Sequence, residues 1–557
     1  MRKYLLLLLI PAMHACNNNA TTYDTIIRNA MIYDGNGGAP YKGDIAINAD
    51  TIAAMGDLGS SKGKEEIDAK GMAVAPGFSN MMGHSEETLF EDNRGLSDVK
   101  QGVTMEVFGE SSFAPLNATM KKQMQEGQGD IKYNVSWNTL GEYMNALEKK
   151  GIALNISSFV GTGTIRQYVI GEGNVAPTAQ QLDSMKMLVD QAMEEGALGV
   201  TNALIYPPDF FAKTDELIAL SKEASKYGGT YSSHMRSEGN RFVEAVNEII
   251  TISKEANIPV HIYHLKAAGK DNWNKMDSVI KMVNDARAAG MPITADMYTY
   301  LAGATGLTSS FPPTLQDGGF GKLWERLHDP AIRKQMATAM NTNANDWENL
   351  YYGCGGAEHV LMLGFKQDSL KKYTGKTLAE VAKMHGKSPE ETAMDLIIAD
   401  STRVGVAYFL MNEDNVKKQV AQPWVSFGSD EGSYNPADTV FMKSQPHPRA
   451  YGNFARVLGH YSRDEKVLTL QQAIYQLAKL PVETLKIKKR GELKVGNYAD
   501  IIIFDPAKVN DLATYDKPAQ LATGMIDVFV NGKLILKEGE PTNATPGRFV
   551  KGPGYKQ

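Results

Sequence analysis

The middle of the chain alternates between segments with helical periodicity and short apolar runs. The predicted helices lie between Thr178 and Gly196, between Thr214 and Gly228, and over 242–255 and 276–289. The apolar runs that follow them cover 197–204, 231–234, 258–264 and 291–298. Gln181 stands at capping-box spacing from Thr178, and Thr214 is the expected cap of the second helix. This order predicts a series of βα units.

Three of the apolar runs end near a polar residue that can carry chemistry, namely His234, His264 and Asp296. The carboxyl ends of the strands of a (β/α)8 barrel converge on one face, where active sites lie. We therefore predict an α/β fold with a TIM (β/α)8 barrel. A doubly wound sheet is the alternative, but no glycine-rich phosphate loop stands at the first βα turn.

The two ends of the chain carry short predicted strands, over 25–33 and 44–48 on one side and 499–505 and 528–535 on the other. Neither set buries its apolar faces alone, so both are expected to combine into one small β-sandwich domain. Two independent flaps are the alternative.

The predicted domains follow from these patterns. They are a β-sandwich part at 22–75, the barrel at 76–485 and a second β-sandwich part at 486–550. The segment 301–349 interrupts the βα rhythm and is either a lid over the site or a decoration of the scaffold.

Composition and charge narrow the function. The 557 residues are 43% hydrophobic and 22% charged, which is typical of a globular protein. The formal net charge of −6 argues against a nucleic-acid partner, which would favour a basic surface. A small-molecule substrate is expected instead, and the oligomeric state is not readable from the pattern.

The first residues resemble a bacterial lipoprotein signal. Arg2 and Lys3 precede a short apolar run, and Ala15 stands before Cys16. We expect residues 1–16 to direct the chain to the cell envelope, in the periplasm or at the outer membrane, with a lipid on Cys16 as the only membrane attachment. Ordinary secretion is the second choice. Cys354 would remain as a single thiol, which cannot form an internal disulfide.

Candidate chemistry begins with the two strand-end histidines. Imidazole is a common zinc ligand, and His234 and His264 would face one axis. His261 lies three residues before His264 and is interpreted as a packing residue. Asp430 follows another apolar run and is a candidate strand-end carboxylate.

An ordered set of short motifs resembles the amidohydrolase superfamily, and within it the N-acyl-D-amino-acid deacylases (D-aminoacylases). The motifs stand at 75–78, 102–104, 195–199, 231–238, 264–269, 296–298, 428–430, 446–452, 490–491, 499–500 and 530–532. They run in order over nearly the whole chain after residue 25. The resemblance implies a TIM barrel with a small β-sandwich built from both termini.

The chain also departs from this family at several positions. The family usually has two histidines after Pro-Gly-Phe, whereas this chain has Met82 and His84. Its usual metal-ligating cysteine is replaced by a stretch with Glu110 and Ser111, and a usual histidine by Thr162. Ala304 stands where many relatives carry a serine.

The resemblance and the departures together imply one zinc ion per subunit, held by Glu110, His234 and His264. Asp430 would take a proton from the zinc-activated water and pass it to the departing amine. The candidates for substrate contact are Lys266, Tyr298, Arg449 and His84. Glu106, on the same strand as Glu110, is a competing ligand that lies deeper.

The expected reaction is hydrolysis of the amide bond of an N-acyl-D-amino acid or a similar carboxylate-bearing amide. A dipeptidase or cyclic-amide hydrolase on the same scaffold is an alternative. A surface binding protein that has lost its chemistry is the alternative from another class, motivated by Met82, Ser111 and Thr162.

Overall fold

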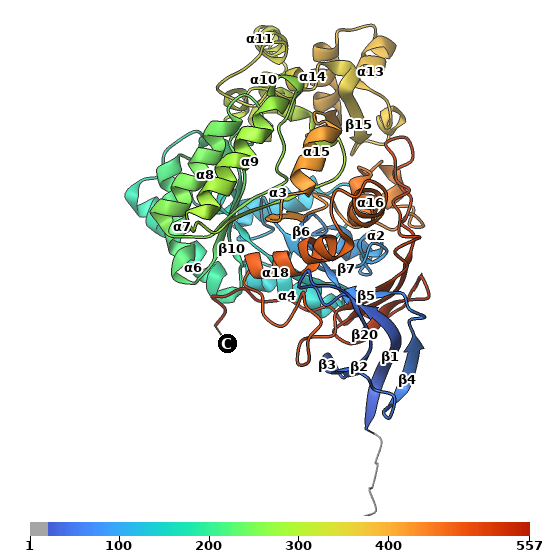
Figure 1. Cartoon of the computed structure of the whole chain (residues 1–557). Helices are drawn as coiled ribbons and strands as arrows, with labels where there is room; N and C mark the ends of the chain where they lie inside the picture. The colour runs from blue at the N-terminus through green and yellow to red at the C-terminus, as the bar shows by residue number, and fades with distance from the viewer. Residues whose placement is uncertain (1–20, 557) are drawn as a thin grey trace, which may run out of the picture.

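A computed structural model describes residues 21–556 of the chain (Figure 1). The predicted signal segment 1–16 lies outside the described residues. Among the helices described, none combines the length and apolarity needed to cross a bilayer.

Parallel strands form the centre of the molecule. They are β6 (Phe78–Gly83), β7 (Val103–Phe108), β8 (Asn155–Ser158), β9 (Val160–Gly161), β10 (Gly199–Ala203), β11 (Thr230–His234), β12 (Val260–Ile262), β13 (Ile293–Met297) and β17 (Val425–Phe427). One parallel sheet joins β6, β7 and β8, and another runs β17-β13-β12-β11-β10-β9. Only Phe159 separates β8 from β9, and Asp430 N–H donates to Met82 O at 2.8 Å, which brings the end of β17 beside β6. This arrangement confirms the predicted TIM-type barrel with an additional sheet domain.

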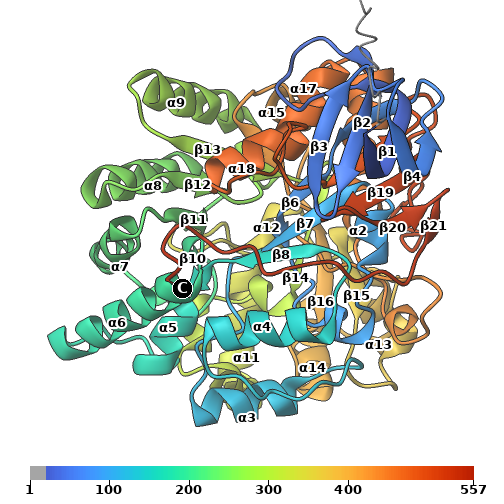
Figure 2. The same cartoon turned by 90° about the horizontal axis from the view of Figure 1, so that it is seen from below.

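Helices α6 (Ala179–Glu195), α7 (Thr214–Lys226), α8 (Phe242–Ala256) and α9 (Met276–Ala288) form a row outside β10 to β13 (Figures 1 and 2). α6 begins with the predicted capping box of Thr178 and Gln181 and ends at Gly196, whose φ is 111°. The prediction that Thr214 caps α7 is wrong, because Thr214 is already helical. Its hydroxyl donates to Glu248 Oε1 at 2.7 Å instead of accepting from the helix start.

The two chain ends combine into one nine-stranded sheet. Its strands are β1 (Thr22–Ile32), β2 (Tyr41–Asn48), β3 (Thr51–Gly56), β4 (Lys62–Asp68), β5 (Ala73–Pro76), β18 (Ile501–Phe504), β19 (Met525–Val530), β20 (Lys533–Lys537) and β21 (Glu540–Pro541). β5 pairs with β18 and thereby joins the N-terminal to the C-terminal strands. Ile501 and Ile503 pack with residues of β1 to β3, whereas Ile502 packs into the barrel core.

The single strand expected at 528–535 is two strands of a hairpin. Asn531 and Gly532 have φ values of 46° and 75°, which the turn between β19 and β20 requires. A Cβ on Gly532 would lie 2.1 Å from Ala49 O, so glycine is needed there for close approach as well.

The C-terminal segment runs along the underside of the barrel (Figure 2). Val550 N–H donates to Ile156 O at 2.8 Å, and Gly552 N–H donates to Gly196 O at 2.9 Å. The opposite end of the barrel, where the strands terminate, is therefore the end that carries the cavity described below.

The insertion after β13 extends beyond the expected range 301–349. It contains the antiparallel strands β14 (Ala302–Gly306), β15 (Val360–Gly364) and β16 (Gly405–Phe409), with helices α10 (Phe320–Arg326), α11 (Pro330–Met340), α13 (Leu378–His385) and α14 (Pro389–Asp400). The helices, β15 and β16 share a hydrophobic core of their own, and the insertion lies at the top of Figure 1. β14 borders the cavity at the strand ends. The lid function stays a prediction.

Candidate active site

The candidate residues converge on one cavity of about 530 Å³ at the carboxyl ends of the barrel strands. His84, Glu110 and Tyr298 follow β6, β7 and β13, whereas His234 is the last residue of β11. The other candidates lining the cavity are His264, Lys266, Asp430 and Arg449. All eight predicted site residues therefore lie around one space.

Glu110, His234 and His264 form a group that fits a metal ion. Glu110 Oε1 lies 2.7 Å from His234 Nδ1 and 2.8 Å from His264 Nε2. The ligand atoms of the three side chains lie within 4.8 Å of one another. Two imidazole nitrogens and one carboxylate oxygen suit zinc, and three protein ligands leave a position for water.

The two histidines set the charge of Glu110. Burial would raise the pKa of Glu110, but His234 and His264 hold it well below its usual range. The carboxylate is therefore ionised and able to act as a ligand at neutral pH.

Glu238 supports His264 from the side away from Glu110. Its Oε1 lies 2.9 Å from His264 Nδ1 and accepts from Lys266 Nζ at 2.7 Å. Burial would raise the pKa of Glu238, but Lys266 and the histidines hold it at about 2. A ligand at Nε2 of His264 requires a proton on Nδ1, and Glu238 is the acceptor for that proton. Glu238 belongs to the motif at 231–238, but its residue type and spacing alone do not indicate this role.

Asp430 lies between a histidine and an arginine. His84 Nε2 is 3.2 Å from Oδ1, and Arg449 Nη1 is 2.7 Å from Oδ2. Burial would raise the pKa of Asp430, but Arg449 and His84 hold it at about 2. Burial would lower the pKa of His84, but its hydrogen bond to Asp430 and the nearby Glu86 raise it to about 9. His84 is thus a partner of Asp430 rather than a member of the group around Glu110.

The proposed substrate-carboxylate residues gather around one aromatic ring. Lys266 Nζ lies 5.5 Å and Arg449 Cζ 4.3 Å from the centre of the Tyr298 ring. The Tyr298 hydroxyl is buried and has no hydrogen-bond partner within residues 21–556. Both cations are already paired, Lys266 with Glu238 and Arg449 with Asp430. The free hydroxyl can therefore donate to a carboxylate that enters the cavity, and two positive charges lie close to the same ring.

Three of these residues have an unusual backbone conformation. Glu110, His264 and Asp430 have φ values of 63°, 36° and 51°, in the left-handed region. Such residues cost of order 1–3 kcal/mol each and cluster at functional sites. Each stands just after its strand, where the turn directs the side chain into the cavity.

Asp296 does not reach the cavity, contrary to the expectation that each strand end presents its polar residue there. It is buried below the site, where Oδ1 accepts from His264 N–H and Oδ2 faces His261 Nε2, both at 2.8 Å. Asp296 therefore fixes the backbone of His264. His261 is fully buried and also contacts Thr294, in line with its interpretation as a packing residue.

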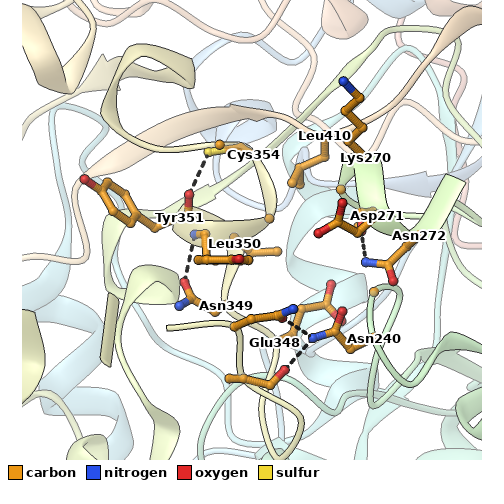
Figure 3. A pocket seen from close by; sticks show the side chains of 18 of the residues that line it. Asn240, Lys270, Asp271, Asn272, Glu348, Asn349, Leu350, Tyr351, Cys354 and Leu410 are labelled. Carbon is orange, nitrogen blue, oxygen red and sulfur yellow. Dashed lines mark hydrogen bonds between the residues drawn. The ribbon is translucent and has the colours of Figure 1, made fainter. Parts of the chain in front are cut away.

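A second cavity, of about 800 Å³, lies between the barrel and the insertion (Figure 3). Leu350 and Leu410 line both cavities. Cys354 lies buried in its wall, and burial raises the pKa of the thiol to about 12. Among the described residues, the grouped metal-ligating side chains lie at the strand ends instead. The chemistry is therefore assigned to the smaller cavity.

Comparisons with known proteins agree with this geometry. The chain is 28% identical to the D-aminoacylase of Alcaligenes xylosoxydans xylosoxydans, over 96% of this chain and 98% of that protein. It is 30% identical to an N-acyl-D-aspartate deacylase of the same organism, over 95% of each chain. The crystal structure of an N-acyl-D-glutamate deacylase from Bordetella bronchiseptica, complexed with zinc and a phosphonate inhibitor, matches with a TM-score of 0.79 and 26% identity. That match covers 95% of this chain and 100% of the other.

A family model described as "Amidohydrolase family" matches residues 65–536. This span includes the barrel, the insertion and most of the C-terminal strands. Because the match covers most of the chain, the protein belongs to the amidohydrolase family.

Proposed function

We propose that this protein hydrolyses the amide bond of N-acyl-D-amino acids with one zinc ion per chain. The observation that carries the proposal is the convergence of Glu110, His234 and His264 with Asp430 in one cavity. The relatives named above act on N-acyl-D-amino acids, by their names, and supply the substrate class. Met82 supports a single ion, because it is fully buried in an apolar cluster where a second histidine ligand would be needed.

Each residue has a distinct role in this proposal. A zinc ion held by Glu110, His234 and His264 would polarise the scissile carbonyl and lower the pKa of a water. Asp430 is ionised at neutral pH, so it accepts a proton from the attacking water and delivers it to the departing amine. His84 and Arg449 hold its two carboxylate oxygens in place.

Tyr298, Lys266 and Arg449 orient the substrate in this proposal. The Tyr298 hydroxyl donates to the substrate carboxylate, and Lys266 and Arg449 supply positive charge close to the ring. Because this group and Asp430 lie in the same cavity, the scissile amide beside that carboxylate is brought to the proton acceptor.

The test combines metal analysis with turnover of a panel of N-acyl-D- and N-acyl-L-amino acids, dipeptides and cyclic amides. We expect about one zinc per chain and turnover of the D-series. His234→Ala should lose both metal and activity, whereas His328→Ala, at an exposed histidine, should keep both. Asp430→Asn should lower kcat by about 10²- to 10⁴-fold with the metal retained.

The panel also separates the alternatives. Turnover confined to dipeptides or cyclic amides would replace the proposed substrate class. Binding of N-acyl amino acids without metal or turnover would indicate the binding protein instead. A His234→Ala variant with unchanged activity would refute the proposed site.

The proposed location is the cell envelope, with a lipid on Cys16. The support is the residue pattern of the first sixteen residues alone. Cys16→Ser should move the protein from the detergent phase to the aqueous phase in a partition experiment. An unchanged partition would refute the lipid anchor.

A further inference from the structure

The wall of the active-site cavity that the insertion provides carries an exposed cation, Arg403. Its Cζ lies 4.7 Å from the centre of the Tyr206 ring, and its Nη2 donates to Thr305 Oγ1 at 3.2 Å. The Tyr206 hydroxyl donates to the same Thr305 oxygen at 2.9 Å. The Tyr206 ring also lies 5.4 Å from the ring of His234. This cluster of Arg403, Thr305 and Tyr206 therefore borders the metal-ligand group directly.

Arg403 differs from the other cations of the cavity because no carboxylate of the described residues pairs with it. Lys266 is paired with Glu238, and Arg449 with Asp430. Within the described part of the chain, Arg403 forms no salt bridge, and its polar contacts are hydroxyls of threonines. A guanidinium that is held in place but lacks a carboxylate offers a site for an anion.

The backbone next to Arg403 is shaped to hold this side chain. A Cβ on Gly306 would lie 2.8 Å from both Cβ and Nε of Arg403. Gly306 has φ −80° and ψ 146°, which any residue adopts, so its backbone does not require glycine. The close approach of Arg403 is therefore the main constraint at this position.

The cluster and the proposed carboxylate site at Tyr298 lie beside neighbouring parts of β14. A Cβ on Gly303 would lie 3.2 Å from the Tyr298 hydroxyl, so Gly303 borders that site. Thr305 stands two residues further along β14, which places it about 7 Å away along the strand. The Tyr298 hydroxyl and Arg403 therefore lie beside positions of β14 that are two residues apart and line the same cavity, which suits a substrate with two anionic groups.

We propose that Arg403, with Thr305 and Tyr206, binds a second anionic group of the substrate, in addition to the carboxylate held at Tyr298. This inference rests on the proposed function and specifies its substrate class. The second anion is a carboxylate either on the side chain of the amino acid or on the acyl group. Both sources present the same chemistry to the guanidinium.

The experiment measures kcat/KM of the zinc-loaded protein with three substrates. N-acetyl-D-glutamate carries the second carboxylate on the side chain, N-succinyl-D-leucine carries it on the acyl group, and N-acetyl-D-leucine lacks it. We expect one dianionic substrate to be preferred. Arg403→Gln should lower kcat/KM for that substrate by about 10- to 150-fold, the equivalent of one hydrogen bond to a charged group. Turnover of N-acetyl-D-leucine should not change.

Two further variants sharpen the result. Gly306→Ala should displace the guanidinium without removing its charge. It should therefore also lower kcat/KM for the preferred dianionic substrate relative to N-acetyl-D-leucine. Lys334→Gln removes an exposed positive charge from α11, elsewhere on the insertion, and should leave all three rates unchanged. Because Arg403 is exposed, its replacement should not prevent folding, which the N-acetyl-D-leucine rate reports independently.

The outcomes are distinct. If Arg403→Gln loses the preference for one of the two dianionic substrates, the proposal is supported. The substrate concerned shows whether the second carboxylate comes from the side chain or from the acyl group. An Arg403→Gln variant that lowers all three rates equally, or none, overturns it, and the proposed function stands because N-acetyl-D-leucine is still turned over by the unsubstituted protein. If no N-acyl-D-amino acid is turned over, the proposed function fails, and the second anion site fails with it.

Discussion

The role of Glu238 leads to a prediction about metal affinity. Replacing Glu238 with glutamine keeps the size of the side chain and removes its charge. Glu238 is 2% exposed and contacts both His264 Nδ1 and Lys266 Nζ. Without the negative charge, His264 Nδ1 keeps only the weaker amide oxygen as an acceptor for its proton, so Nε2 loses part of its basicity.

The expected magnitude follows from comparable partners of metal-ligating histidines. Their loss lowers metal affinity by about 10- to 100-fold, or about 1.4 to 2.8 kcal/mol. We expect the same range for Glu238→Gln. The Lys266 ammonium, which lies 2.7 Å from His264 Nδ1, would then face the ring without a neutralising charge and add to the loss.

The assay is a zinc titration of metal-free protein against a chelating indicator, at a pH where the protein is folded. Glu244→Gln is the matched control, because Glu244 is an exposed residue of α8 and contacts neither histidine. A zinc dissociation constant of Glu238→Gln equal to that of the control would refute the role assigned to Glu238.

Three further predictions concern pH and stability. Arg449→Met should raise the pKa of Asp430, which must be ionised to accept a proton. The acid limb of the pH profile of kcat/KM should therefore move to higher pH, and it should move less in Arg449→Lys, which keeps a positive charge. Burial raises the pKa of Asp98 to about 7 in the folded protein. The free energy of unfolding therefore falls as the pH rises from the pKa of this carboxyl in the unfolded chain towards 7. Asp98→Asn should therefore raise Tm at pH 8 more than at pH 4, and an equal shift at both would contradict this. Arg166 Nη1 lies 2.8 and 2.6 Å from the two carboxylate oxygens of Glu216 in a buried pair. Glu216→Gln should cost about 3–5 kcal/mol in denaturant unfolding, and a loss below 1 kcal/mol would refute the pairing.

Local patterns in the sequence were sufficient for the barrel helices. α6 begins at the predicted capping box, and of the apolar residues at helical spacing, Met185, Val189 and Met193 are buried and Leu182 is partly buried. These features depend on side chains three or four residues apart, so the sequence states them directly. The hairpin at Asn531 and Gly532 was missed although Asn-Gly between two apolar runs is a local signal for a two-residue hairpin turn, because the prediction treats 528–535 as one segment.

Local sequence patterns did not predict the extent of the insertion. β14 pairs with β16 across about a hundred residues, β16 also pairs with β15, and the core of the insertion forms only when these distant segments meet. The expected end at 349 fell inside this unit, because no local signal marks β16 as the partner of β14 and β15.

The sequence by itself determined which side chains can carry the chemistry, since histidine and carboxylate at strand ends and the ordered family motifs are properties of the chain alone. The tertiary structure decided which of them meet. Asp296 has the same strand-end position as His234, yet it lies below the cavity and holds His264. Glu238 and Arg403 became visible only in three dimensions, because their roles depend on the distance to His264 and on the absence of a neighbouring carboxylate among the described residues. Such distances follow from the packing of segments far apart in the chain, and no residue type or spacing encodes them.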